Sequence, residues 1–419
     1  MPNAASARWL AAAVLHALVR GAFSLRGLRR ASRFGGRESC GPFRFVTPLD
    51  FEAVGDGVTD DTAAVLAAFR EGSRCTGVLL PRGKKFLVTP GEVKVTLRDT
   101  LVQLAGELVG PSLRRWNPGL QGWPEGSCAY GKAECPPGTD PESSRSHWAL
   151  LHLVASRNVT VSGGGLLSAP GEGFWRVRNV KAAVRAYCLL KVERSKSINL
   201  SSLRLVDSPL YHVVVASSQH VRLEHLRVTV NDRETIHDYA RNTDGISIGP
   251  NSTDIVVQDC DVASGDDNLV VKGGSRRVLA KGLVLRRGKG LSIGSLGERR
   301  SDGTVQDCRF ENVTMLGTMF GARIKTWRGG RGAVQNVTFA GVHVRDVLTP
   351  IMVDQEYCPV SQHPGGCKNE AGHVQLAAVR FQGVEGTFSG GAERDVRCKS
   401  HCDLSFAGMQ LARRAPAQR

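Results

Sequence analysis

From residue 148 onward, hydrophobic residues occur in short runs in which apolar and polar positions alternate. Asn, Asp, Ser and Gly separate these runs. Short β-branched runs bounded by such residues are typical of β-strands. The runs recur at roughly 20 to 30 residues, an interval that indicates a repeated and stacked unit. Examples are the segments 158–161, 197–200, 220–223, 254–257 and 333–337.

The repeat favours a parallel β-helix over a β-propeller. A propeller blade needs about 40 residues, and the repeat here is shorter. No strong helical periodicity lies between the runs. In a β-helix each coil adds one rung, so equivalent positions on neighbouring coils lie about 4.8 Å apart. We therefore expect an all-β solenoid.

An N-terminal module over 45–90 is expected to close one end of this solenoid. The turn 55–57 precedes a helical segment over 60–69, which ends before Gly72. Such a helix would cap the open end of the repeat. Residues 111–147 are rich in Pro, Gly and charge, and they predict a long loop.

Residues 1–37 have the character of a targeting segment. They combine an apolar stretch with seven arginines and no acid. This pattern favours a secretory signal or a membrane anchor, with an organelle transit peptide as the alternative. No other stretch approaches the roughly 18 apolar residues that span a bilayer.

The chain carries a net charge of +16, of which about +9 remains without the leader. A basic excess favours an anionic partner such as nucleic acid, an acidic membrane surface or a polyuronate. No recognised nucleic-acid-binding module occurs, which argues against the first of these.

Eleven cysteines are many for a cytosolic protein. No cysteine cluster has zinc-finger spacing with His partners, so close pairs predict disulfides instead. The odd count leaves at least one thiol free. Five Asn-X-Ser/Thr sequons permit glycosylation and add to the argument for the secretory route. The expected close pairs are Cys128 with Cys135, Cys358 with Cys367, and Cys398 with Cys402.

Charged residues recur at the spacing of the coils. Asp244 lies 22 residues before Asp266, and Lys289 lies 22 residues after Asp267. On stacked coils these side chains would converge on one patch. Adjacent strand residues point to opposite faces, but Gly265 indicates a bend at which both neighbouring aspartates can reach one cleft.

Further along the chain, Arg323 and Lys325 share one strand face and are placed to clamp a carboxylate. Three carboxylates beside cations suit glycoside hydrolysis, in which one acid protonates the leaving oxygen and another carboxylate activates water. Crowding raises the pKa of at least one carboxyl group, which keeps it available as the acid.

Over roughly residues 47–402 the sequence resembles glycoside hydrolase family 28, the polygalacturonases. Three motifs occur in the family's order and approximate spacing: Asn242-Thr-Asp244, Gly265-Asp-Asp267 and Arg323-Ile-Lys325. Other segments that resemble family signatures are 54–62, 208–212, 290–297 and 354–358. The resemblance implies a right-handed parallel β-helix with a capping helix, and an inverting hydrolase that needs no metal or other cofactor.

The resemblance also implies roles for single residues. Asp266 would be the general acid, while Asp244 and Asp267 would hold and activate the water. Arg323 and Lys325 would bind the galacturonate carboxylate. Asn242 would shape a turn or touch sugar, and for His212 a structural role has equal weight. The further expected substrate contacts are Asn242, Lys289, Tyr357 and His212.

Lys289 departs from the family pattern, which usually has Gly-His-Gly where this chain has Gly288-Lys289-Gly290. Asn268 follows the aspartate pair, and the cysteines usual near this place are absent. A lysine is a fixed cation that stabilises ionised carboxylates and lowers the pKa of the acid. We expect either weakened activity with a more acidic optimum, or lost turnover with binding retained.

The expected substrate is homogalacturonan, with rhamnogalacturonan and xylogalacturonan as alternatives and with internal or terminal attack left open. A non-catalytic polysaccharide-binding protein and a polysaccharide lyase are the rival classes. The expected division of the chain is a targeting segment over 1–37, the β-helix over 38–405 and a basic tail over 406–419. We expect a secreted monomer.

Overall fold

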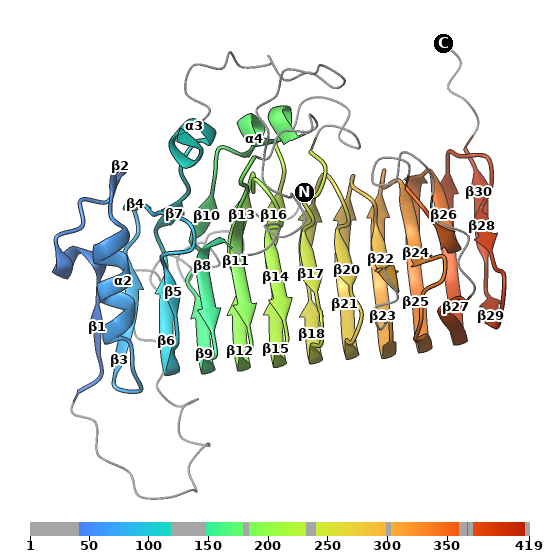
Figure 1. Ribbon diagram of the computed structural model, residues 1–419, viewed down its shortest axis with the longest axis horizontal. Coiled ribbons are helices and arrows are strands. Elements are labelled where there is room, and N and C mark those ends of the chain that lie inside the picture. Colours follow the sequence, from blue (N-terminus) through green and yellow to red (C-terminus); the bar gives the residue numbers. More distant parts are fainter. Residues whose placement is uncertain are drawn as a thin grey trace, which may run out of the picture. The chain divides into compact units, whose positions relative to one another are not determined.

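The computed structural model describes residues 42–118, 148–178, 184–231, 240–298, 303–359, 367 and 372–414. The compact unit Pro42–Arg419 is the expected right-handed parallel β-helix, whose strands stack in register from coil to coil (Figure 1). The predicted leader and the predicted pair Cys128/Cys135 lie outside the described residues. None of the helices in the described ranges is long and apolar enough to cross a membrane.

One face of the solenoid is a parallel sheet of ten strands, one from each successive coil. Its strands are short, and their outward side chains form continuous rows along the solenoid because the register is kept. In chain order the strands are β5 (Lys94–Val95), β8 (Ala149–Val154), β11 (Cys188–Glu193), β14 (Val213–Ala216), β17 (Ile246–Ile248), β20 (Leu269–Val271), β22 (Leu291–Leu296), β24 (Phe320–Trp327), β26 (Thr349–Tyr357) and β28 (Arg394–Arg397).

The remaining twenty strands form one larger parallel sheet. In the later coils one long strand spans what earlier coils divide between two, since β21 pairs with both β18 and β19. The strands are β1 (Arg44–Val46), β2 (Asp56–Asp60), β3 (Thr76–Leu80), β4 (Lys85–Leu87), β6 (Arg98–Leu104), β7 (Glu107–Val109), β9 (Arg157–Ser162), β10 (Leu166–Ser168), β12 (Lys196–Ser201), β13 (Arg204–Val206), β15 (Gln219–Glu224), β16 (Arg227–Thr229), β18 (Thr253–Gln258), β19 (Asp261–Ala263), β21 (Arg276–Arg286), β23 (Val305–Leu316), β25 (Ala333–Val347), β27 (Gln375–Phe388), β29 (Cys402–Ala407) and β30 (Gln410–Arg413).

The alternating runs of the sequence form these strands, with their apolar positions inside. Val159, Ile198, Val221 and Ile255 pair in register on four successive coils, and each is buried. Stacking of like residues packs the interior continuously and removes large apolar surfaces from water.

The polar or charged residue near the start of each run lies at a corner of its coil. At one equivalent corner the residue adopts a left-handed backbone on each coil: Asn158, Ser197, His220, Asp254 and Arg277. Residues with short polar side chains reach this conformation at lower cost than β-branched residues. The residues near the start of the runs therefore mark one bend of each coil.

Helix α2 (Thr62–Glu71) caps the N-terminal end of the solenoid, as expected (Figure 1). Its apolar side chains Val65, Ala68 and Phe69 are fully buried. Asp61 fixes the preceding turn, because its carboxylate accepts the backbone N–H groups of Val54 at 2.8 Å and Gly55 at 3.0 Å. The N-terminal family signature is therefore structural.

Shorter helical elements lie between strands. These are the 3₁₀-helix η2 (Pro48–Phe51) and the helices α3 (Leu113–Trp116) and α4 (Gly171–Arg178). Helix α3 starts inside the segment predicted as a long loop.

The predicted boundary between solenoid and tail at residue 405 is too early. Strand β29 continues to Ala407, and β30 follows and pairs in parallel with β27. The alternating pattern of 410–413 forms a last half-coil in spite of its basic residue.

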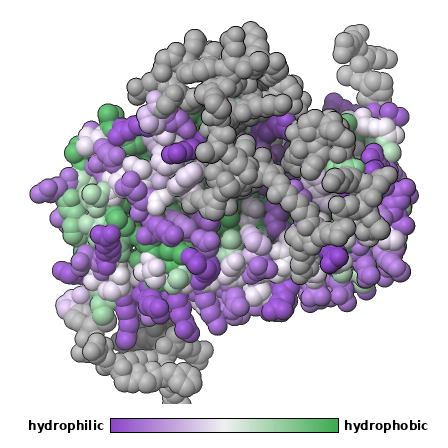
Figure 2. All heavy atoms as spheres, viewed as in Figure 1, coloured by the Kyte–Doolittle hydropathy of each residue, from purple (hydrophilic) through white to green (hydrophobic). Residues whose placement is uncertain are grey.

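Exposed large apolar side chains gather at the N-terminal end of the solenoid, around β1 and β2 (Figure 2). Disulfides join Cys358 with Cys367 and Cys398 with Cys402, as predicted. Among the described cysteines, the buried Cys188, Cys260 and Cys308 form no disulfide.

Candidate active site

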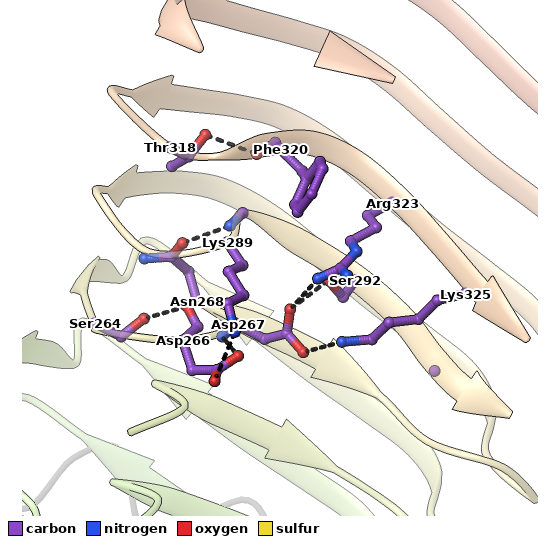
Figure 3. Close-up of polar contacts among 12 residues, drawn as sticks. Ser264, Asp266, Asp267, Asn268, Lys289, Ser292, Thr318, Phe320, Arg323 and Lys325 are labelled. Carbon is purple, nitrogen blue, oxygen red and sulfur yellow. Dashed lines mark hydrogen bonds and ion pairs between the residues drawn. The ribbon is translucent and has the colours of Figure 1, made fainter. Parts of the chain in front are cut away.

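The predicted aspartates and Lys289 lie beside strands of the ten-stranded sheet, on consecutive coils. Asp244 precedes β17, the pair Asp266 and Asp267 precedes β20, and Lys289 precedes β22. Backbone bonds join these turns: Gly245 N–H donates to Asp267 at 2.9 Å, and Lys289 N–H donates to Asp266 at 2.8 Å. The spacing of 22 residues therefore stacks the three clusters, as expected. Figure 3 shows Lys289 next to the two neighbouring aspartates.

Asp266 is held as a carboxylate by donors on both of its oxygens. Oδ2 accepts the backbone N–H of Asn242 at 2.9 Å and the ammonium of Lys289 at 3.0 Å. Oδ1 accepts the N–H of Asp267 at 2.9 Å. Burial would raise the pKa of Asp266, but the charges of Lys289 and Lys325 and the Asn242 N–H outweigh it, and the pKa lies well below its ordinary value.

Asp267 binds the two cations of β24 (Figure 3). Lys325 Nζ donates to Oδ2 at 2.8 Å, and Arg323 Nη1 lies 3.6 Å from Oδ1. The hydroxyl of Ser292 on β22 donates to Oδ1 at 2.6 Å. Burial opposes ionisation, yet these cations lower the pKa of Asp267 below its ordinary value.

Asp244 differs from the other two aspartates because it forms no ion pair with any described residue. Its side chain is buried, with 3% of its surface exposed. Burial, followed by the negative charges of Asp266 and Asp267, raises its pKa to about 8. Near neutral pH the site therefore holds one protonated carboxyl group, on Asp244, and two carboxylates.

The two lysines Lys325 and Lys289 differ in the direction in which their pKa is shifted. Burial and the neighbouring Arg323 lower the pKa of Lys325 to about 8. For Lys289 burial also opposes the charge, but the carboxylates of Asp266 and Asp267 outweigh it and raise its pKa above the ordinary value. Lys289 is thus a permanent cation beside Asp266, as the sequence predicts.

Arg323 carries donors that no described residue accepts. Its Nε and Nη1 atoms are buried without a hydrogen-bond partner in the described part of the chain. The guanidinium lies over the ring of Phe320, 4.3 Å from its centroid. A buried donor without an acceptor is costly, and an acceptor from a bound molecule would remove this cost.

Tyr357 lies next to these cations, as expected. Its ring centroid is 5.9 Å from the Arg323 guanidinium carbon and 5.8 Å from Lys325 Nζ. The ring packs edge-on against Trp327, the residue with which it pairs across β24 and β26.

His212 was predicted to contact substrate, and the structure corrects this. Its side chain is fully buried. Nδ1 lies 3.1 Å from the backbone carbonyl of Asp244, and Nε2 accepts the N–H of Ser208. Burial lowers the pKa of His212 to about 4, so the ring is neutral. It holds the turn that carries Asp244 and has no surface left for a ligand.

Two asparagines shape the neighbouring turns. Asn242 has a left-handed backbone with φ of 57°, and its N–H binds Asp266, in agreement with the predicted turn. Asn268 is fully buried; its amide donates to Val262 O, and its oxygen accepts from Gly290 N–H.

Among the described residues, no group of three or more His, Cys, Asp or Glu side chains could hold a metal ion. Ser292 and Phe320 were missed as site residues. Only the 290–297 signature pointed to the first, and no sequence signal pointed to the second.

A parallel β-helix whose outer face carries clustered carboxylates and cations defines a glycoside hydrolase of the β-helical class. The chain belongs to Glycosyl hydrolases family 28, whose sequence model matches residues 139–415.

Sequence relatives agree with this assignment. A probable polygalacturonase of Arabidopsis thaliana is 30% identical over 358 residues, which cover 83% of this chain and 69% of the relative. A polygalacturonase of Prunus persica is 30% identical over 347 residues, which cover 80% of this chain and 77% of the relative.

Solved structures share the fold. An endo-xylogalacturonan hydrolase from Aspergillus tubingensis superposes with a TM-score of 0.67 at 20% identity, covering 88% of this chain and 93% of its own. A polygalacturonase from Erwinia carotovora gives a TM-score of 0.64 at 18% identity, covering 91% and 96%.

Proposed function

We propose that this chain hydrolyses the α-1,4-galacturonosyl bonds of homogalacturonan, with inversion at the anomeric carbon. The observation that carries the proposal is the combination of three clustered aspartates with the unfilled buried donors of Arg323. The planar guanidinium suits bidentate binding of a carboxylate, which each galacturonate unit supplies. Lys325 keeps further N–H donors for the same group while bound to Asp267.

The reaction needs one protonated and one ionised carboxyl group. Following the family pattern, we assign Asp266 as the acid and Asp244 with Asp267 as the groups that hold and activate water. In the resting site the proton lies on Asp244, while Lys289 keeps Asp266 ionised. The productive form has the same number of bound protons, but the proton has moved from Asp244 to Asp266.

In this arrangement the aspartate pair sets how the rate depends on pH, whereas Lys289 lowers the rate itself. The two groups titrate as a pair, so the limbs of the pH–rate profile belong to the pair and not to either residue. Because Lys289 disfavours the productive arrangement, only a minor fraction of the protein turns over at any pH. The result is the weakened activity expected of a lysine at this position.

The test is release of reducing ends from de-esterified homogalacturonan between about pH 3 and 8, with Asp266→Asn as the blank. Activity that disappears in the variant supports the proposal. Product absorbance in the ultraviolet is recorded in parallel, because elimination leaves an unsaturated sugar and hydrolysis does not. Retention of the polymer without turnover at any pH would instead establish a binding protein.

The same assay on rhamnogalacturonan and xylogalacturonan tests the substrate. The proposal predicts faster release from homogalacturonan, because the Arg323 and Lys325 pair requires a free carboxylate on the sugar at the cleavage site. Faster release from rhamnogalacturonan would contradict this assignment.

We further propose that the protein acts outside the cell, on wall polysaccharide. The disulfides Cys358–Cys367 and Cys398–Cys402 support an oxidising compartment. A C-terminally tagged chain should be recovered from the medium without its leader. Recovery in the membrane or in an organelle would favour the anchor or the transit peptide instead.

A further inference from the structure

Lys272 lies beside the catalytic aspartates, although no motif pointed to it. It follows β20, and its ammonium donates to the carbonyl of Gly294 on the next coil at 3.1 Å. Gly294 pairs in register with Lys325 on the coil after that. The Lys272 ammonium therefore lies about one rung, roughly 4.8 Å along the solenoid axis, from the coil that carries Lys325.

The charge of Lys272 reaches the catalytic groups. It lowers the pKa of Asp244, of Asp267 and of Lys325, although in each case burial has the larger effect. Val271 pairs in register with Ile293, so Lys272 occupies the same row of the ten-stranded sheet as Gly294 and Lys325.

The other cations of the site already have carboxylate partners. Lys289 pairs with Asp266, and both Arg323 and Lys325 pair with Asp267. Lys272 has no carboxylate partner among the described residues, and its printed contact is a neutral carbonyl. With Asp244 protonated, the four cations and two carboxylates leave an excess of two positive charges.

Glycines flank Lys272 at the equivalent positions of both neighbouring coils. Gly249 on the preceding coil approaches so closely that a Cβ there would lie 2.7 Å from the Lys272 Cβ. Gly294 on the following coil also lacks a side chain. The half-buried lysine thus has no side chain beside it at the equivalent position of either neighbouring coil, and its ammonium binds Gly294.

We propose that Lys272 binds the carboxylate of a second acidic sugar, next to the one that Arg323 and Lys325 bind. The inference rests on the proposed function and deepens it. One rung is close to the length of one sugar ring, so neighbouring units of the polymer can meet the two cationic positions. The preferred substrate then contains consecutive unesterified uronates, and a single acidic unit among neutral or esterified sugars binds more weakly.

Binding, rather than turnover, tests this proposal most cleanly. Asp244→Asn is the background, because asparagine reproduces the neutral charge of the protonated carboxyl group while removing the chemistry. Calorimetry measures the affinity of this variant for an oligogalacturonate and for its fully methyl-esterified counterpart. The measurements are repeated with Lys272→Met added, and with Lys281→Met as the matched control, since Lys281 lies on the other sheet in β21.

We expect Lys272→Met to weaken binding of the oligogalacturonate by about tenfold or more, in line with the loss of one charge-assisted hydrogen bond. The methyl ester should bind all three proteins alike, and Lys272→Arg should restore most of the loss. Equal weakening of both ligands would show that Lys272 only supports Gly294 and would overturn the proposal. So would unchanged binding of the oligogalacturonate.

These outcomes are independent of turnover. If the wild-type protein binds the oligogalacturonate through Lys272 but releases no reducing ends, the proposed hydrolysis fails while the second carboxylate site stands.

Discussion

Asp244, Asp266 and Asp267 are chemically identical, and their neighbours give them different protonation states. Asp266 and Asp267 each have a cation within 3.0 Å, whereas Asp244 is buried next to the negative charges of the other two. Environments that push the pKa values of carboxyl groups apart are the basis of acid and base catalysis. Here the separation places the proton on the residue that the family pattern assigns to water activation.

Replacing Lys289 with histidine should therefore increase the rate. Above about pH 7 a histidine is mostly neutral, so the charge that lowers the pKa of Asp266 is removed. A larger fraction of Asp266 is then protonated, with an increase in kcat on the order of tenfold for one pKa unit. Loss of the positive charge also raises the pKa values of the aspartate pair, so the pH–rate profile moves to higher pH.

The measurement is kcat against pH for the wild-type protein and for Lys289→His, with Lys281→His as the control for a histidine elsewhere. An unchanged rate together with an unchanged profile would contradict the role given to Lys289.

Asp244 should also change how the free energy of unfolding depends on pH. Its folded-state pKa of about 8 lies above the unfolded value, so its stabilisation is fully present below about pH 4 and is lost as the pH rises through about 8. Asp244→Asn removes this titration. Between about pH 5 and 8 the variant should gain up to roughly 1.4 kcal/mol in free energy of unfolding per pH unit relative to wild type.

Urea unfolding of both proteins at several pH values checks this sign. Two parallel dependences on pH would mean that Asp244 is ionised in the folded protein.

Among single residues, the sequence predicted those that lie at equivalent places on successive coils. Spacing was sufficient for Asp244 and Asp266 because stacking converts a repeat length into proximity. His212 was assigned to the cleft because the spacing of a motif does not show whether a side chain points outward or inward. Lys272 was missed because a lysine at a strand end is indistinguishable from a solvated one until the register is known.

Among the elements, the aromatic stack inside the later coils is a source of stability. Phe310, Phe339, Phe381 and Phe406 pair in register, with ring centroids 4.9 to 5.1 Å apart. Their planes are within 17° of parallel. Each added coil thus extends both a sheet and an aromatic column.

Removing one ring from the middle of this column should be costly. Phe339→Ala leaves a cavity between two rings, and we expect a loss of about 3–5 kcal/mol in the free energy of unfolding. Val58→Ala is the control, since Val58 is 71% exposed and should change stability by less than about 0.5 kcal/mol. Urea denaturation measures both, and similar losses for the two variants would show that the column carries no special stability.

The strands and the capping helix were predictable because their patterns are local. The helix predicted over 60–69 is α2, which begins at Thr62 and ends at Glu71. The long bent strands were not predicted, because Gly282 interrupts the alternation of β21 and makes one bent strand resemble two short runs. The last half-coil β30 was assigned to a basic tail, since charge at an exposed edge outweighed a short alternating pattern.

Over the whole solenoid, outward side chains are spaced at the regular distance between coils. Equivalent positions on neighbouring coils lie about 4.8 Å apart along the solenoid axis. Lys272, Gly294 and Lys325 form one such row. A linear polymer of acidic sugars matches such a surface in both repeat and charge. The net charge of about +9 that remains without the leader is consistent with attraction of this polymer.

The central claim is that the aspartates of this surface hydrolyse an α-linked galacturonan by direct attack of water. Proton NMR of the first products from oligogalacturonate tests it most directly, because the new reducing end is observed before it mutarotates. The account predicts that the β-anomer appears first, that no unsaturated sugar forms, and that Asp266→Asn gives no product. First appearance of the α-anomer or of an unsaturated sugar, or the absence of any product from the wild-type protein, would contradict it.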